Sequence, residues 1–522
     1  MKSMESMESM EKYSRMFKMY DIRTDYKNLT GEAGTVLISA IAEYYRDSVK
    51  VKSVFVGRDA RIHCAGLMNR ILEIFPEYGL NVFFDPVPIS TCRFYYTCMK
   101  QNDMGGIMIT SSHNPGNYVG FKFVGRNSTP IAMECGPEGG IKKIKSIFLT
   151  GPAIPECSER GKVRIMQCQR EYVDYSLKLA GIKPGELAGM KIFAEFLSGS
   201  AGAEFAEAFE KAGADVALSN PVPDGLFPQG DPNPIIEASI APSRERMRRG
   251  QYDIGFCFDG DGDRMDLMYH DGSQIIPGLN MSLIFPYIRD IFKPYFGEDY
   301  SCRLFVDVKA VPLALMEIAA AGAEQHIVRN GHSFIKETLR KHMEDGFVAA
   351  EEETAHYYMN FPFDPDDLSK GFAATENSLF FALVTAKAMK ENPDGYKRAF
   401  ELQKGLYRCR EWPLYFNVYD EMGNIMRDVE EIFRSCGATV IKNMDDGSDL
   451  DAALMRFHLP VHLKPGMKLP EKWCQVAQRI SRSEEAMTRW EVVASAPELC
   501  DDINNMIRSV ADAYVEKGLA HY

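Results

Sequence analysis

The segment Asp259-Gly260-Asp261-Gly262-Asp263-Arg264 constrains this chain more than any other. Three carboxylates alternate with two glycines, so their oxygens can converge while the backbone turns tightly behind them. Apolar runs at residues 252–258 and 265–270 flank the segment, which predicts a loop between two buried strands. Converging carboxylate oxygens are ligands for a hard cation such as Mg²⁺. A solvated turn is the alternative, because Asp and Gly are turn residues.

An EF-hand calcium loop is excluded for the same segment. That loop needs Gly at its sixth position and Glu at its twelfth. Counted from Asp259, the chain has Arg264 and His270 at these positions. The metal hypothesis is therefore a Mg²⁺ site with room for a phosphate oxygen.

The size and charge of the chain limit the class of protein. Its 522 residues exceed one hydrophobic core, and about 100–200 residues per domain predict three to four domains. The apolar fraction of 45% is that of a soluble globular protein, and the net charge of −13 argues against non-specific nucleic-acid binding. The longest apolar stretch near the C-terminal half, residues 379–386, is too short to cross a bilayer. An anionic substrate would need a local cluster of Arg and Lys.

The 12 cysteines are spread singly, without a C-x-x-C pair. This spacing, and the lack of an apolar secretion signal in the Met-Glu-Ser repeat at residues 1–12, predict free thiols in a reducing cytoplasm. We expect the repeat to be a frayed tail.

Strand-like and helix-like segments alternate in three successive blocks, and a stretch rich in Pro and Gly at residues 151–161 makes a plausible linker. From about residue 398 the chain changes character, which predicts a separate α+β domain ending in a helix at 497–517. The periodicity predicts strands at 53–56, 81–84, 106–110, 121–124, 191–196 and 304–308, and helices at 62–75, 203–212, 312–321, 334–342 and 377–389.

A second informative segment is Thr110-Ser111-Ser112-His113-Asn114-Pro115. It begins where a strand ends, and Asn-Pro forces a turn that can expose a serine to a substrate. One alternative is a polar loop whose hydroxyls satisfy nearby backbone groups. A Ser-His-Asp hydrolase is another, but the G-x-S-x-G elbow is absent around Ser112.

Together the two segments resemble the α-D-phosphohexomutase superfamily, the phosphomannomutase and phosphoglucomutase group. The similarity runs over nearly the whole chain after about Met16. Further matches follow in the family's order: Tyr20-Asp21-Ile22-Arg23, Val56-Gly57-Arg58-Asp59-Ala60-Arg61, Gly120-Phe121-Lys122, Phe227-Pro228, Asp231-Pro232-Asn233-Pro234, Asp307-Val308-Lys309 and Gly331-His332-Ser333-Phe334-Ile335-Lys336.

The resemblance implies an α/β fold, with three related α/β domains and a C-terminal α+β domain around a central cleft. We place these domains at residues 1–155, 156–273, 274–395 and 396–522. It also implies an isomerase that interconverts hexose 1-phosphate and hexose 6-phosphate (mannose and/or glucose), with Mg²⁺ and a hexose 1,6-bisphosphate. A phosphosugar is then the partner of a cytoplasmic monomer or homodimer, without nucleic acid or membrane.

The resemblance assigns roles to residues. The catalytic set is Ser112, which carries the phosphoryl group, with Lys122, Arg23, His113 and Arg264. The metal ligands are Asp259, Asp261, Asp263 and Ser112. The substrate-binding set is Lys309, His332, Glu352, Thr354, His356, Arg479, Ser481 and Ser483.

Two of these elements depart from the family pattern. The sugar loop is usually G-E-x-S-G-H, but here it is Glu351-Glu352-Glu353-Thr354-Ala355-His356. Alternation predicts that Glu352, Thr354 and His356 face one side of an extended segment. Ala355 limits the backbone to φ values open to alanine. The C-terminal R-x-S-x-T phosphate loop aligns with residues 479–484, where an unremarkable surface turn is the alternative.

Two other residues have a structural interpretation, and a third has a functional one. Arg61 is predicted to be structural, and His332 could be simply the first residue of a helix. Lys122 lies on an apolar strand between two phenylalanines, where a depressed pKa would suit proton transfer.

Three other functions stay open at this point. One is a phosphoglucosamine mutase, and another is a metal-dependent phosphatase. The third is a catalytically silent relative that binds partners as a scaffold, suggested by the altered sugar loop.

Overall fold

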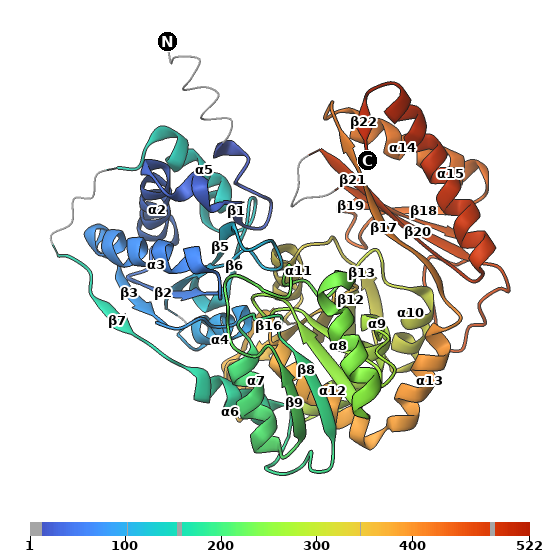
Figure 1. Cartoon of the computed structure of the whole chain (residues 1–522), viewed down its shortest axis with the longest axis horizontal. Helices are drawn as coiled ribbons and strands as arrows, with labels where there is room; N and C mark the ends of the chain where they lie inside the picture. The colour runs from blue at the N-terminus through green and yellow to red at the C-terminus, as the bar shows by residue number, and fades with distance from the viewer. Residues whose placement is uncertain (1–12, 102, 154–158, 345, 481–485) are drawn as a thin grey trace.

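The computed structural model describes residues 13–101, 103–153, 159–344, 346–480 and 486–522. Its strands form four sheets that follow one another along the chain (Figure 1). Across these ranges, we find no helix with both the length and the apolar character needed to span a bilayer. The predicted tail at residues 1–12 lies outside the described residues.

The first sheet has the order β1-β5-β4-β2-β3-β7, and β6 pairs with β5. Its strands β2, β3, β4 and β7 are parallel to one another, whereas β5 runs antiparallel to β4 and β1. The strands are β1 (Ile22–Asp25), β2 (Ser53–Arg58), β3 (Asn81–Phe84), β4 (Gly105–Ile109), β5 (Tyr118–Val124), β6 (Pro130–Ile131) and β7 (Val163–Ile165), and the helices are α2 (Glu32–Tyr44), α3 (Ile62–Ile74), α4 (Thr91–Lys100) and α5 (Ile141–Thr150).

The second sheet has the order β11-β10-β8-β9. Here β8, β9 and β10 are parallel, and β11 is antiparallel to β10. The strands are β8 (Lys191–Glu195), β9 (Asp215–Ser219), β10 (Ile254–Phe258) and β11 (Met265–Met268), and the helices are α6 (Gln169–Leu179), α7 (Gly202–Ala212) and α8 (Glu237–Gly250).

The third sheet has the order β13-β12-β14-β15-β16, in which β15 runs antiparallel to both β14 and β16 and the other pairs are parallel. The strands are β12 (Cys302–Val306), β13 (Glu324–Ile327), β14 (Phe347–Glu352), β15 (His356–Pro362) and β16 (Phe372–Glu376), and the helices are α9 (Pro277–Phe296), α10 (Pro312–Ala320), α11 (His332–Lys341), α12 (Ser378–Glu391) and α13 (Pro393–Gln403).

The fourth sheet, order β18-β19-β20-β21-β17-β22, is antiparallel throughout, as expected for an α+β domain. The strands are β17 (Tyr407–Phe416), β18 (Thr439–Asn443), β19 (Asp449–Phe457), β20 (Cys474–Ile480), β21 (Met487–Ala494) and β22 (Ala520–His521), and the helices are α14 (Glu421–Ser435) and α15 (Pro497–Glu516).

The first three sheets share one structural feature. In each, a parallel strand ends and the chain turns directly into an antiparallel neighbour: β4 into β5, β10 into β11, and β14 into β15. The serine loop, the aspartate loop and the sugar loop are these three turns. All three therefore lie at the carboxyl ends of parallel strands, where α/β sheets place their ligand sites.

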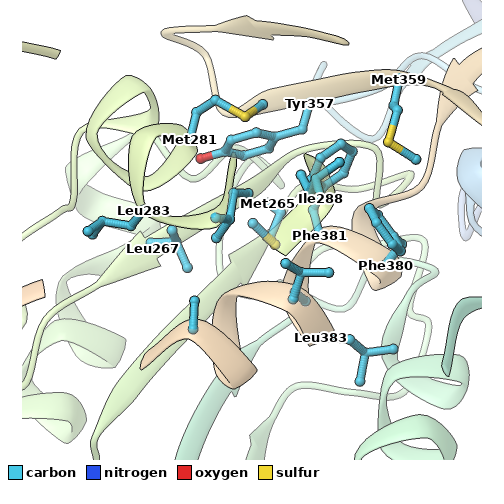
Figure 2. Close-up of a cluster of buried hydrophobic side chains, with 14 of the residues drawn as sticks. Met265, Leu267, Met281, Leu283, Ile288, Tyr357, Met359, Phe380, Phe381 and Leu383 are labelled. Atoms are coloured by element: carbon cyan, nitrogen blue, oxygen red, sulfur yellow. The ribbon is translucent and has the colours of Figure 1, made fainter. Parts of the chain in front are cut away.

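A single apolar core holds the second and third sheets together (Figure 2). It joins Met265 and Leu267 of β11 to Tyr357 of β15, and α9 and α12 contribute Ile288 and Phe381. All five side chains are buried. Because interiors are close-packed, this core fixes the aspartate loop relative to the sugar loop.

The sugar loop differs from its prediction. It is a tight hairpin turn rather than an extended segment, and Glu352 is paired with His356 across it. Ala355 adopts φ of +65°, a left-handed conformation that the sequence argument had not expected of alanine. The reason is the short connection between β14 and β15, which must reverse within three residues. The Ala355 N–H closes this turn by donating to the Glu352 carbonyl at 2.9 Å.

The strain at this position predicts that Ala355→Gly stabilises the protein. A left-handed alanine costs about 1–2 kcal/mol, and glycine removes most of this while losing more chain entropy, for a net gain of about 0.5–1 kcal/mol. Thermal unfolding of both proteins measures the difference. Ala373→Gly, in the interior of β16, is the control and should destabilise; a lower midpoint for Ala355→Gly would contradict the assigned backbone.

Candidate active site

The serine loop, residues 110–115, holds its serine in a strained backbone. Ser112 has φ of 51°, in the left-handed region. Its N–H donates to Thr110 Oγ1 at 2.9 Å, and an Arg61 guanidinium N–H donates to its carbonyl oxygen at 2.9 Å. Such strain persists only where surrounding contacts impose it, and it is typical of functional sites.

Arg61 supports this loop from behind. Its side chain is fully buried, pairs with Asp59 and also donates to the Asn114 carbonyl. The guanidinium lies 5.1 Å from the ring centroid of Phe227. A planar fork of five N–H donors can hold several acceptors in fixed directions, so Arg61 has the structural role predicted for it.

The aspartate loop gathers three buried carboxylates. Asp259, Asp261 and Asp263 are at most 3% exposed, and one oxygen of each lies within 4.8 Å of the others. A side chain at Gly260 would bring its Cβ to 2.9 Å from the Ser112 carbonyl oxygen, so glycine permits the close approach of the two loops. Burial, and repulsion from Asp263 and Asp261, raise the pKa of Asp259 to about 8.

The serine hydroxyl meets this acidic cluster. Ser112 Oγ donates to Asp259 Oδ2 at 3.1 Å, and His113 Nδ1 lies 3.1 Å from Ser112 Oγ. Burial, and the positive charges of Arg264 and Arg23, hold the pKa of His113 well below its usual value. His113 is therefore neutral at physiological pH.

Lys122 projects from β5 into the cluster, but with a charge state opposite to the prediction. Its Nζ donates to Asp261 Oδ2 at 2.8 Å and to Asp263 Oδ2 at 2.5 Å. Burial alone would lower the pKa of Lys122, yet the two carboxylates outweigh burial and hold it well above the ordinary value. The predicted depressed pKa is wrong, because the sequence does not reveal these two partners.

The sugar loop contacts the aspartate loop directly. The Met265 N–H donates to the Ala355 carbonyl at 3.0 Å, and His356 Nε2 lies 3.0 Å from Asp263 Oδ1. His356 Nδ1 lies 3.3 Å from Glu352 Oε2 and 3.3 Å from Thr354 Oγ1. The three predicted residues therefore do converge, although across a turn.

Neighbouring charges determine the protonation states of His356 and Glu352. Burial would lower the pKa of His356, but Asp263 and Glu352 raise it to about 10. Burial would raise the pKa of Glu352, but the hydrogen bond and charge of His356 lower it to about 2. An imidazolium between two carboxylates results.

The predicted phosphate loop is only partly described. Ser481 and Ser483 lie outside the described residues. Arg479 Nε donates to Glu411 Oε1 at 2.7 Å, and Arg489 Nη1 donates to Glu411 Oε2 at 3.1 Å. The sequence analysis missed Glu411 and Arg489, since Arg489 stands directly opposite Arg479 only through the register of β20 and β21.

The remaining predicted residues are also brought to the site. Arg23 donates to Asp21 at 2.7 Å and to the Asn114 side chain at 3.3 Å. Arg264 Nε lies 3.8 Å from Asp259 Oδ2. His332 begins α11, and its ring centroid is 5.8 Å from that of Tyr20.

One cleft of about 1300 Å³ joins these groups. Residues of all four sheets or their loops line it, and Arg and Lys outnumber Asp and Glu in the lining. A local excess of cations in a protein of net charge −13 is what an anionic ligand requires. From the predicted set, the lining includes Ser112, His113, Lys122, Arg23, Arg264, Asp263, Lys309, His332, Glu352, Thr354, His356 and Arg479.

The aspartates fit a divalent cation. Asp261 Oδ1 is buried, and within the described part of the chain no donor bonds to it. The raised pKa of Asp259 reports repulsion that a cation would relieve. Oxygen ligands alone suit Mg²⁺ better than a softer metal.

Comparison with known proteins agrees with this geometry. Residues 14–147 match the family model of phosphoglucomutase/phosphomannomutase alpha/beta/alpha domain I, and residues 170–272 match that of domain II. A phosphomannomutase of Escherichia coli K12 is 28% identical over 355 residues, covering 66% of this chain and 73% of the relative. A phosphoglucomutase of Neisseria meningitidis serogroup A is 28% identical over 353 residues, covering 67% and 72%.

Solved structures share the fold. A phosphoglucomutase/phosphomannomutase family protein of Burkholderia thailandensis superposes with a TM-score of 0.72 at 20% identity, covering 96% of this chain and 97% of that one. The pp63/parafusin phosphoglucomutase of Paramecium gives 0.70 at 15% identity, covering 96% and 95%. The expected architecture of α/β domains with a C-terminal α+β domain around a cleft is confirmed.

The matched domain models, the relatives and the shared architecture converge on one conclusion. The family models match residues 14–147 and 170–272, and with the named relatives they support a place for the chain in the α-D-phosphohexomutase superfamily and among the phosphotransferases of the isomerase class.

Proposed function

We propose that the protein interconverts hexose 1-phosphate and hexose 6-phosphate, with mannose and/or glucose as the sugar. The reaction runs through a phosphoserine at Ser112 and a hexose 1,6-bisphosphate. The observation that carries this proposal is the 3.1 Å contact between Ser112 Oγ and Asp259 Oδ2 beside a cation-rich cleft. The names of the relatives, phosphomannomutase and phosphoglucomutase, support the choice of sugars.

The phosphoserine solves a problem of reach, because no single group can touch both ends of a hexose. In the first transfer the P–Oγ bond of phospho-Ser112 breaks, and a P–O bond forms to the free sugar hydroxyl, which gives up its proton. The bisphosphate then turns within the cleft. In the second transfer its other phosphoryl group returns to Ser112 Oγ, and the isomer leaves with the proton restored to the freed oxygen.

The residues that would hold Mg²⁺ are Asp259, Asp261, Asp263 and phosphorylated Ser112. The bound ion supplies charge neutralisation for the phosphoryl group. The chain's own residues do the positioning.

Proton and charge handling fall to different groups. Lys122 carries its proton and donates to two aspartates, so it stabilises negative charge and can act as a general acid. His113 is neutral beside Ser112 Oγ, and we assign it as the nearest proton acceptor. Arg23 and Arg264 line the cleft next to the serine loop, where they steady the moving phosphoryl group.

Substrate binding is assigned to further residues of the cleft lining. Glu352, Thr354 and His356 present acceptors and donors to sugar hydroxyls, with Lys309 and His332 beside them. Arg479, together with Ser481 and Ser483, would hold the phosphate that does not react. The Arg489 guanidinium, joined to Arg479 through Glu411, adds positive charge beside Arg479.

Ser112→Ala is expected to lower mutase turnover by about three orders of magnitude or more, because the group that accepts phosphorus is gone. Turnover is measured with mannose, glucose and glucosamine 1-phosphates and a catalytic amount of hexose 1,6-bisphosphate. The purified wild type should also carry a phosphate mass increment on the peptide containing Ser112.

Ser111→Ala is the matched control. The neighbouring Ser111 hydroxyl is buried and bonds to nothing within the described part of the chain, so its loss should leave turnover nearly unchanged. Undiminished turnover in Ser112→Ala would end the phosphoserine assignment. A preference for glucosamine 1-phosphate in the wild type would replace the proposed sugars.

Asp261→Asn should raise the Mg²⁺ concentration for half-maximal activity about tenfold or more, because it removes one of three negative charges while keeping the side-chain shape. A Mg²⁺ titration of turnover measures the shift. The exposed Asp271→Asn, in the turn after β11, provides the control. An unchanged titration for Asp261→Asn would count against the aspartate loop as the metal site.

The raised pKa of His356 predicts how the stability of the protein depends on pH. Its pKa is raised from 6.5 to about 10, so its stabilising contribution is complete below about pH 6.5 and is lost as pH rises through about 10. The unfolding free energy of the wild type minus that of His356→Gln, measured without Mg²⁺, should therefore fall between pH 7 and pH 10. The exposed His462→Gln should show no such trend; a constant difference for His356→Gln would overturn the assigned ion pair.

A further inference from the structure

Two cysteines of the C-terminal domain form a close pair. Cys409 lies on β17 and Cys500 in the first turn of α15, 91 positions later, and their Sγ atoms are 3.2 Å apart. Helix α15, red in Figure 1, packs on β17, which is orange. The cysteine spacing predicted isolated thiols, because the proximity of these two arises only from this packing.

The geometry favours a covalent bond between them. A disulfide needs an S–S distance of about 2.05 Å, so the two sulfur atoms must approach by only about 1.2 Å. Their other contacts are weak: Cys409 Sγ lies 3.8 Å from Asp501 Oδ1, and Cys500 Sγ lies 3.7 Å from the Val492 carbonyl oxygen. No strong hydrogen bond would be given up when the sulfur atoms move together.

The two thiols differ in access. Cys409 is half-buried, whereas Cys500 is 2% exposed. A small oxidant can therefore reach Cys409 first, and Cys500 is positioned behind it to complete the bond. This arrangement of an accessible thiol with a resolving thiol is typical of redox-sensitive pairs.

The pair adjoins the cleft wall. Alternation along β17 directs Cys409 to the helix side and the adjacent Arg408 to the opposite face. Arg408 donates to Glu491 at 2.8 Å and to Glu353 of the sugar loop at 3.2 Å. The strand pairing shifts register just after Cys409, before Trp412, and Glu411 lies within this irregular segment. A bond at Cys409 would therefore restrain the segment that carries both cleft residues.

We propose that Cys409 and Cys500 are a redox-active dithiol pair, oxidised to a disulfide by low-molecular-weight disulfides such as oxidised glutathione. The Cys409 thiolate attacks one sulfur of the oxidant, breaking its S–S bond and releasing one thiolate. The Cys500 thiol then loses its proton and attacks Cys409 Sγ, which expels the second thiolate. The protein loses two electrons and two protons, and the oxidant becomes two thiols.

The pair reacts slowly at neutral pH. Burial, with the neighbouring Cys500 and Asp501, raises the pKa of Cys409 to about 12. Only a small fraction is thiolate at pH 7, so thiol–disulfide exchange is slow. The slow exchange protects the two thiols during brief exposure to oxidant, and it requires a long incubation in the experiment.

The test uses the purified full chain incubated with oxidised glutathione at pH 8. Free thiols are then alkylated, and the protein is digested without reduction. We expect a peptide that links Cys409 to Cys500, lighter by two hydrogens than its reduced parts and free of glutathione. Dithiothreitol should abolish it. In Cys500→Ser, glutathione should instead remain attached to Cys409.

Cys436→Ser is the matched control, since Cys436 is the exposed thiol of the same domain. This variant should form the same linked peptide as the wild type. Modification of Cys436 in the wild type proves that the oxidant was active. If Cys436 is then modified while Cys409 and Cys500 stay alkylated, or if Cys409 keeps its glutathione with Cys500 present, the proposal is wrong.

Discussion

Three carboxylates buried together are the constraint on which this structure depends. Asp259, Asp261 and Asp263 repel one another, and burying such charge is costly unless cations and donors compensate it. The compensation comes from three directions. Lys122 arrives from β5, His356 from β15 and the Ser112 hydroxyl from the loop after β4. Electrostatic attraction to the three aspartates, as well as packing, therefore holds the first three sheets together.

The fourth sheet is attached through two apolar clusters. The large core of the second and third sheets also takes in Leu459, Leu463, Trp473 and Val493 of the C-terminal domain, and a smaller cluster of Val308, Leu450, Ala452 and Ala477 lies between the third and fourth sheets. Polar links add to it, such as Gln475 donating to the Ala310 carbonyl at 2.9 Å and Arg408 pairing with Glu353. Apolar and polar contacts together therefore hold the C-terminal domain against the rest of the cleft.

Sequence reasoning succeeded where a signal is local. Period-2 and helical patterns predicted β3, α3 and α7 within a few residues, because the burial of each element repeats along its own length. It failed where a property depends on a distant partner. The pKa of Lys122 is raised by aspartates some 140 positions away, and the sugar loop reverses because β15 must pair with β14. Arg489 and Glu411 escaped notice because only strand register sets them beside Arg479.

The pairing of β20 with β21 sets Arg489 opposite Arg479. The same pairing explains why the part of the cleft formed by the C-terminal domain stays positively charged. Two arginines directly opposite each other on neighbouring strands repel, which is destabilising by itself. Glu411 reduces this repulsion by accepting from both guanidinium groups, yet one carboxylate against two cations leaves a net positive charge. These side chains are mostly buried and Arg479 holds Glu411 through two hydrogen bonds, so only a ligand that satisfies both arginines could take the place of Glu411. A phosphate dianion carries more charge than Glu411 and can displace it without leaving either arginine unpaired.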